Sequence, residues 1–301
     1  MALIPIDDHD IAAARALRVE FARFWSTAEG EPRDVYDRFI GATPVAPGVA
    51  TREVEEDPGP GWWCEPPGVV AGRAILFIHG GGYGLGHAGP YVGLASQIAV
   101  RARAPVFALE YPLAPEHKLP AALNLAVATL ARLASLFASV AVVGDSAGGG
   151  LSFATVLEAR RRGVPVSAVV AFSPWTDLGL SGASVRELAV GDPLLAVDYL
   201  RSSAAAYLGS APVTDPRASP LFEVGPRLPP TLIQVGSDEV LRDDSRRFAE
   251  AASGAGTEVV LEEWQGMHHV FQLNVRELGS ARRALDNAAA FLERTWTAPA
   301  R

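Results

Sequence analysis

Short apolar runs of about strand length recur along most of the chain, and stretches with helical spacing separate them. The apolar runs lie at residues 74–78, 105–109, 139–143, 168–172 and 231–235. Between them, helical patterns cover residues 91–103, 121–136, 146–162 and 241–254. Short non-alternating strands that alternate with helices are typical of a parallel sheet covered on both faces. The pattern therefore predicts an α/β fold, completed by a last strand at 258–264 and a helix near 280–296.

Two segments depart from this alternation. Apolar positions from residue 11 to 25 have helical spacing after a good N-cap, Asp10, and a second short helix is expected over 31–40. Residues 181–224 contain helical patches and a proline-rich exit but no strand. An insertion at the carboxyl edge of such a sheet would lie above an active site. We therefore expect a helical cap from residues 1–45 and 181–224, on a core formed by residues 46–180 and 225–301.

Composition and charge argue against several classes of function. The chain has 301 residues, 49% of them hydrophobic and 20% charged, which are ordinary values for a globular protein with a sizeable core. A formal net charge of −8 argues against a nucleic-acid partner. The single cysteine, Cys64, excludes an intramolecular disulfide and has no metal-site spacing. With no membrane-length apolar stretch and no signal-like N-terminus, we expect a cytoplasmic protein without membrane insertion.

A sharp strand-to-helix turn lies at residues 144–148. The apolar run 139–143 ends at Gly144, Ser146 follows, and Gly148 precedes a helical pattern. A nucleophile elbow needs small residues on both sides of its serine because the turn is tight. In that geometry Ser146 would be exposed at the apex, and the N–H of Ala147 would face a developing oxyanion. The alternative is a glycine-rich loop that binds phosphate at a helix N-terminus.

A glycine-rich loop, His79-Gly80-Gly81-Gly82, directly follows the run 74–78. Consecutive glycines let a backbone approach a ligand and turn N–H groups toward it, which for acyl transfer would supply the rest of an oxyanion hole. No G-x-G-x-x-G frame or Walker-A lysine supports a nucleotide loop here. We expect His79 to orient this loop rather than to act as a base.

A general base and its acid partner are expected after the last two strands. His268 and His269 follow the strand at 258–264, where an imidazole could reach a nucleophile on a neighbouring strand. Carboxylates follow the strand at 231–235, and spacing does not choose among Asp238, Glu239 and Asp243. The chain order nucleophile, acid, base is that of α/β-hydrolases.

Three motifs together resemble the hormone-sensitive-lipase-like (bacterial family IV) esterases of the α/β-hydrolase superfamily. They are the glycine loop, the elbow at 144–149 and the segment 111–117, and the resemblance runs from about residue 71 to the C-terminal helix. It implies a mostly parallel eight-stranded sheet flanked by helices, with a helical cap. It also implies that Ser146 is the nucleophile and that the oxyanion donors are the N–H groups of Gly81, Gly82 and Ala147.

The same resemblance implies the other two members of a catalytic triad. Leu241 and Asp243 match the family pattern that follows the acid, which puts the acid at Glu239, although Val240 replaces the usual proline. The segment 266–271 matches the family's histidine loop and makes His269 the base. Residues 173–178 also resemble a family segment, in which we expect Asp177 to cap or anchor. The resemblance implies neither a metal nor an organic cofactor.

These features predict a serine carboxylesterase with a Ser-His-Glu triad that acts on small-molecule esters with short to medium acyl groups. The motif details look most like acetyl hydrolase and epsilon-lactone hydrolase members, so small lactones are a further hypothesis. One alternative is an amidase or deacetylase with the same triad. Another is a non-catalytic ligand-binding receptor of the same fold, but such receptors lack the histidine that stands here at 269. We also expect a homodimer through 258–264, because an open edge strand leaves N–H and C=O groups unpaired.

Overall fold

The sheet of this protein is mixed and mostly parallel. The computed structural model describes residues 2–188, 192 and 194–297. Within that range one sheet has nine strands in the order β1-β9-β8-β7-β6-β4-β5-β3-β2, and only the β2–β3 and β3–β5 pairs are antiparallel. The strands are β1 (Ala2–Ile4), β2 (Ala50–Val54), β3 (Gly61–Glu65), β4 (Arg73–Ile78), β5 (Val106–Leu109), β6 (Ser139–Asp145), β7 (Ala168–Phe172), β8 (Thr231–Gly236) and β9 (Val259–Trp264).

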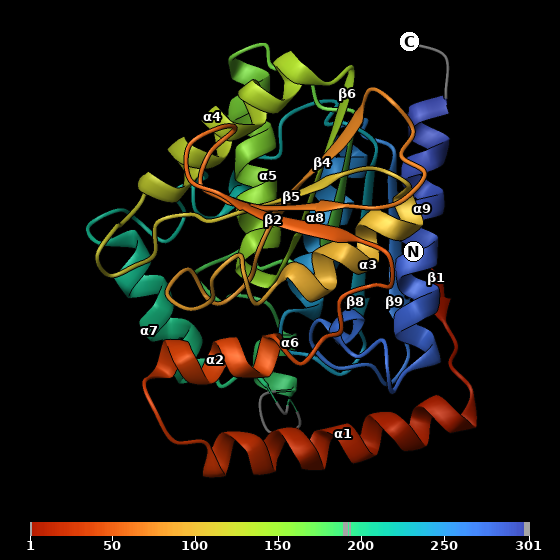
Figure 1. The fold of residues 1–301 in the computed structure, drawn as a ribbon. Helices are drawn as coiled ribbons and strands as arrows, with labels where there is room; N and C mark the ends of the chain where they lie inside the picture. The colour runs from red at the N-terminus through yellow and green to blue at the C-terminus, as the bar shows by residue number, and fades with distance from the viewer. Residues whose placement is uncertain (1, 189–191, 193, 298–301) are drawn as a thin grey trace.

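Helices cover both faces of this sheet (Figure 1). They are α1 (Asp8–Thr27), α2 (Pro32–Ile40), α3 (Val92–Ala102), α4 (Ala121–Leu136), α5 (Ser146–Arg161), α6 (Ser184–Glu187), α7 (Val197–Leu208), α8 (Arg242–Gly254) and α9 (Gly279–Thr297), with 3₁₀ turns η1 (Pro220–Glu223) and η2 (Phe271–Leu273).

Burial on two sides explains the non-alternating apolar runs. Leu76 of β4 packs in one buried cluster with residues of α4, α5 and α8, whereas Phe77 packs in a second cluster with residues of α3 and α9. Successive side chains of a strand point to opposite faces, so a strand between two helical layers needs apolar residues at every position. The expected α/β-hydrolase architecture is confirmed.

The expectation of eight strands is wrong by one, because β1 adds a ninth. This strand pairs in parallel with β9, with Ala2 opposite Glu262 and Ile4 opposite Trp264. A strand of three residues is too short to show an alternating pattern, so the sequence alone predicts these residues as part of the cap segment 1–45. Its presence also means that 258–264 is not an open edge, which removes the physical reason for a dimer through that strand.

The helices α1, α2, α6 and α7 gather at one end of the sheet (Figure 1). Residues far apart in the sequence meet there, since Tyr36 of α2 and Leu200 of α7 line the same cavity as Ser146. Ser146 directly follows β6, so this is the end at which β6 finishes. The helices α1, α2, α6 and α7 therefore cover the carboxyl ends of the central strands.

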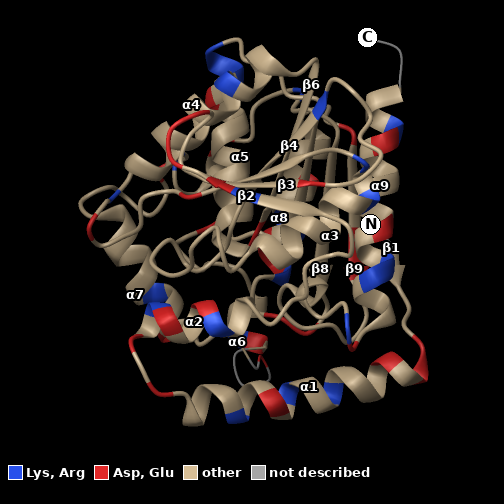
Figure 2. Cartoon of the chain, in the orientation of Figure 1, with Lys and Arg blue, Asp and Glu red and all other residues tan. Residues whose placement is uncertain are grey.

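Charged residues of both signs are interspersed along the outer helices (Figure 2). On α1, for example, Asp8 and Asp10 are followed by Arg15 and Arg18, and then by Glu20 and Arg23. None of the described helices is both long and apolar enough to cross a membrane.

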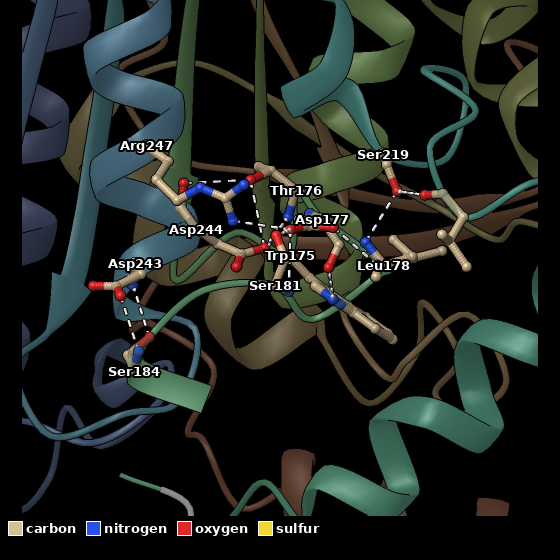
Figure 3. Close-up of polar contacts among 12 residues, drawn as sticks. Trp175, Thr176, Asp177, Leu178, Ser181, Ser184, Ser219, Asp243, Asp244 and Arg247 are labelled. Atoms are coloured by element: carbon tan, nitrogen blue, oxygen red, sulfur yellow. Dashed lines mark hydrogen bonds and ion pairs between the residues drawn. The ribbon is translucent and has the colours of Figure 1, made fainter. Parts of the chain in front are cut away.

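The segment after β7 is anchored to α8 by a buried polar network (Figure 3). Asp244 Oδ2 accepts hydrogen bonds from the backbone N–H groups of Thr176 and Asp177, both at 2.8 Å. The Asp177 carboxylate lies 2.9 Å from Arg247, so Asp177 anchors as expected. Burial, together with the nearby charge of Asp177, raises the pKa of Asp244 to about 7.

This network predicts that the stability of the protein depends on pH. The substitution Asp244→Asn should reduce that dependence. An unfolded aspartate has a pKa of about 3.9, so between about pH 4 and 7 the folded protein holds a proton that the unfolded chain has released. The contribution of Asp244 to the free energy of unfolding should therefore fall as pH rises through this range. An asparagine keeps an oxygen for the two N–H groups and cannot ionise, so its free energy of unfolding should fall less.

Denaturant unfolding at pH 4.5, 5.5, 6.5 and 7.5 would measure the difference. Asp198→Asn is a matched control, because that aspartate is exposed on α7 and forms only a surface ion pair with Arg201. If the Asp244→Asn and wild-type curves fall in parallel, the titration of Asp244 does not contribute.

Candidate active site

The turn between β6 and α5 has the tight geometry that a nucleophile elbow requires. Ser146 has a φ of 53°, a left-handed conformation that is uncommon for residues other than glycine. A Cβ at Gly144 would lie 2.5 Å from the carbonyl oxygen of Gly148, and one at Gly148 would lie 2.1 Å from that of Ile78. The two glycines are required because neighbouring backbone leaves no room for a side chain.

Ser146, His269 and Glu239 form one hydrogen-bonded chain. The distance from Ser146 Oγ to His269 Nε2 is 2.9 Å, and from His269 Nδ1 to Glu239 Oε2 it is 2.5 Å. With Nδ1–H donating to the carboxylate, Nε2 is free to accept the serine proton. Ser146 follows β6, His269 follows β9 and Glu239 follows β8. The sheet order therefore brings together segments that lie more than a hundred residues apart in the chain.

The electrostatics favour a histidine that can take up a proton. Burial lowers the pKa of His269, but the charge of Glu239 and its hydrogen bond outweigh burial, and the pKa is raised above its usual range. Glu239 itself has 0% of its surface exposed. A carboxylate aligned on an imidazole in this way stabilises the imidazolium that forms when the serine is deprotonated.

The other polar residues considered in the sequence do not join this chain. Asp238 pairs with Arg18 of α1 at 2.9 Å. Asp243 accepts the N–H of Ser184 at 2.9 Å. His268 Nε2 bonds Asn274 Oδ1 at 2.9 Å, and burial lowers the pKa of His268 to about 4. Among the described residues, the carboxylate that contacts the His269 ring is that of Glu239.

The glycine loop and the first turn of α5 carry backbone N–H groups that have no acceptor in the described part of the chain. Gly81 and Gly82 line the same cavity as Ser146, and in the described part of the chain neither donates its N–H to an acceptor. Ala147 lies in the first turn of α5, where N–H groups have no partner within the helix. The loop is also tied to the elbow, because Gly80 N–H donates to Asp145 Oδ1 at 3.0 Å.

His79 supports the glycine loop from behind. Its ring stacks between Tyr91 and Tyr111, at centroid distances of 5.2 and 4.2 Å, and its Nδ1 lies 2.8 Å from the Gly80 carbonyl oxygen. Burial lowers the pKa of His79 to about 4, so the ring is neutral and donates to that carbonyl. These contacts agree with the orienting role expected for it.

Three hydrogen bonds at this site were not anticipated from the sequence. Tyr36 of α2 bonds the hydroxyl of Tyr91 at 2.8 Å, and Tyr91 donates to Asp145 Oδ2 at 3.2 Å. The Ser173 hydroxyl donates to Glu239 Oε1 at 2.6 Å. The sequence carried one signal for Ser173, since it directly follows the predicted strand at 168–172. No comparable local signal marks Tyr36.

The serine opens into a small apolar cavity of about 200 Å³. Its walls combine the N-terminal helices with the segment 194–200, through side chains that include Trp25, Phe39, Leu194 and Tyr199. The Tyr199 hydroxyl lies 3.3 Å from the Gly81 carbonyl oxygen. This volume is below the usual range of about 300–1,000 Å³ for small-molecule sites, so only a compact group fits beside the serine.

A second cavity of about 270 Å³ meets the first at His269. Its rim carries charges of both signs, contributed by Glu20, Arg38, Arg276 and Glu277. His269 thus borders both cavities, and the second differs from the first by having charged residues of both signs in a mostly apolar lining.

The described residues contain one cluster with ligand atoms close enough for a metal ion, Asp7, His9 and Asp10. It lies at the start of α1, where Asp7 caps that helix. Asp10 accepts the N–H of Gly279 at 2.9 Å at the start of α9. Both carboxylates therefore act as helix caps.

Comparison with known proteins agrees with this geometry. A family described as alpha/beta hydrolase fold matches residues 75–273. Over 284 residues the chain is 39% identical to an acetyl-hydrolase of Streptomyces hygroscopicus, covering 89% of this chain and 92% of that protein. An esterase of Acinetobacter venetianus is 35% identical over 226 residues, covering 73% and 75%. The crystal structure of an esterase from the bacterial hormone-sensitive lipase (HSL) family superposes with a TM-score of 0.90 and 32% identity, over 94% and 98%.

Proposed function

Because the chain belongs to the hormone-sensitive-lipase-like (bacterial family IV) esterases and is a carboxylic ester hydrolase, we propose that it cleaves short-chain esters through Ser146, His269 and Glu239. The observation that carries this assignment is the unbroken hydrogen-bonded chain from the serine hydroxyl to the buried carboxylate. A nucleophile, a base within reach of it and an acid that orients the base are the parts that acyl transfer requires.

The mechanism proceeds in two halves. Ser146 Oγ attacks the ester carbonyl while His269 Nε2 takes its proton, and the resulting oxyanion is held by the N–H groups of Gly81, Gly82 and Ala147. The protonated His269 then gives this proton to the departing alcohol, which leaves an acyl group on Ser146. Water, activated by the same histidine, attacks the acyl-enzyme and releases the acid.

The cavities support a preference for compact acyl groups. The apolar space of about 200 Å³ contains the serine and the glycine loop, so we place the acyl chain there. The departing alcohol is protonated at His269, which also borders the second cavity with its charged rim. We therefore place the alcohol in that second cavity.

An amide or N-acetyl substrate is the second candidate. It would use the same residues, and the Streptomyces hygroscopicus relative is described as an acetyl-hydrolase, a name that does not specify the bond. Small lactones are a third possibility, since ring opening needs the same serine attack.

A substrate series tests the function. With p-nitrophenyl esters, kcat/KM should be largest for acyl groups of about six carbons or fewer. It should fall at least about tenfold by dodecanoate, because each misplaced methylene costs about 1 kcal/mol or more. Turnover of p-nitroacetanilide and of small lactones, measured in parallel against buffer, tests the two other substrate classes. A maximum at dodecanoate would contradict the acyl placement, and no ester turnover at all would contradict the function.

A further inference from the structure

Residues 173–175, directly after β7, contact all three segments that carry the proposed triad. The Ser173 hydroxyl donates to Glu239 Oε1 at 2.6 Å. The Ser173 Oγ also accepts the backbone N–H of Val270, the residue after His269, at 3.1 Å. The N–H of Trp175 donates to the carbonyl oxygen of Ser146 at 2.9 Å. One short turn is therefore bonded to the acid, to the histidine loop and to the nucleophile elbow.

The hydrogen bonds of the Glu239 carboxylate leave little choice of orientation. Its Oε2 bonds His269, and its Oε1 accepts the Gly236 N–H at 2.7 Å as well as the Ser173 hydroxyl. Glu239 and Ser173 each have 0% of their surface exposed, so water does not replace a missing donor easily. Since a hydroxyl has one proton, the Ser173 O–H points at Glu239 and its lone pairs face Val270.

The backbone at both ends of this contact is held in an uncommon conformation. Ser173 and Val270 each have a φ of 48°. For residues other than glycine, and above all for a β-branched one, this conformation costs about 1–3 kcal/mol and persists only where the surroundings impose it. The Ser173 N–H also donates to the Gln234 carbonyl oxygen at 2.7 Å, which ties the turn to β8 just before the acid.

The turn is itself immobilised against α8, the helix that follows the acid (Figure 3). Asp244 accepts the N–H groups of Thr176 and Asp177, and Asp177 pairs with Arg247. Ser173 is thus fixed on one side by β8 and on the other by the network on α8. A hydroxyl held in this way can fix the positions of the groups to which it is hydrogen-bonded.

We propose that Ser173 is a positioning residue for ester hydrolysis. Its hydroxyl holds the Glu239 carboxylate in line with His269 and, through the Val270 N–H, holds the histidine loop against the same point. It contacts neither the serine hydroxyl nor the cavity, so it acts only through these two partners. The inference rests on the proposed function of Ser146, His269 and Glu239.

Two substitutions at this position separate the effect of losing the hydroxyl from the effect of the strained backbone conformation. Ser173→Ala removes the hydroxyl and keeps a Cβ, whereas Ser173→Gly removes the hydroxyl but suits the left-handed conformation. With p-nitrophenyl butyrate, both should lower kcat by about 10²-fold, the loss typical of a misplaced catalytic group, and leave KM within about twofold. Thermal unfolding should show that the glycine variant is folded at the assay temperature.

A pH profile adds a readout that a purely structural role would not move. Without the Ser173 donor the charge on Glu239 is less stabilised, so the carboxylate holds the shared proton with His269 more tightly. The acid limb of kcat/KM, which reports the base of the free enzyme, should therefore move to higher pH in both variants.

Ser219→Ala is the matched control. This serine is also fully buried, and it accepts the Leu178 N–H (Figure 3). It donates to the Val213 carbonyl oxygen and forms no hydrogen bond with Glu239 or His269. It should lose stability but keep the wild-type kcat and acid limb. The proposal is overturned if the control loses as much kcat as the Ser173 variants, if Ser173→Gly recovers wild-type kcat, or if both variants keep the wild-type rate and profile. Retained activity in Ser146→Ala would instead overturn the proposed function on which this inference rests.

Discussion

Ser146→Ala is expected to lower kcat for p-nitrophenyl butyrate by about 10⁴-fold or more. Removal of a triad serine elsewhere has cost about 10⁶-fold, with the remaining rate supplied by the oxyanion donors and by binding. Here the serine lies 2.9 Å from the histidine and is held at the apex of the elbow. KM should change little, because the cavity walls are untouched.

Ser245→Ala provides the comparison, since that serine is buried on α8 and its hydroxyl has no partner among the described residues. It should retain wild-type turnover. A phosphonate ester that carries a p-nitrophenol leaving group should label the wild type once, on the peptide that contains Ser146. Activity of Ser146→Ala within about tenfold of wild type, or labelling at another serine, would contradict the assignment.

Glu239→Ala should lower kcat by about 10³-fold or more, whereas Asp238→Ala should leave it nearly unchanged. Loss of the buried carboxylate removes the group that orients His269 and stabilises its charged form. Asp238 forms a partly exposed ion pair with Arg18, and such pairs contribute about 0–1 kcal/mol. Initial rates on p-nitrophenyl acetate and butyrate measure both variants side by side.

The conservative substitution Glu239→Gln predicts the direction in which the pH profile of kcat/KM should move. The negative charge of Glu239 raises the pKa of His269, so its removal should lower that pKa. The acid limb of kcat/KM should therefore move to lower pH while kcat falls. If Asp238→Ala alone is inactive, the acid is the neighbouring residue. If both alanine variants are active, Asp243 is the next carboxylate to test.

Local features of the sequence were sufficient for the α/β architecture and for the elbow. Continuous apolar runs indicate strands that are buried on both faces. The glycines around Ser146 are needed because the turn spans only a few residues. The helices α2 and α9 begin and end within one residue of the expected bounds, because their apolar spacing is a property of the segment alone. For such features the controlling forces act between near neighbours in the chain.

The tertiary structure decided which of these pieces meet. Residues 238, 239 and 243 all follow the same strand, and only the packing of the β8 and β9 ends shows that Glu239 reaches the His269 ring while Asp238 turns to Arg18 of α1. The roles of Ser173 and β1 also depend on partners 66 or more residues away in the chain. Hydrophobic pattern encodes whether a residue is buried but not against which residue, because strand order and register are set by packing of the whole sheet. The sequence by itself therefore determined the central strands, most of the helices and the candidate chemistry. The sheet order determined the contacts among them and added β1 at the edge.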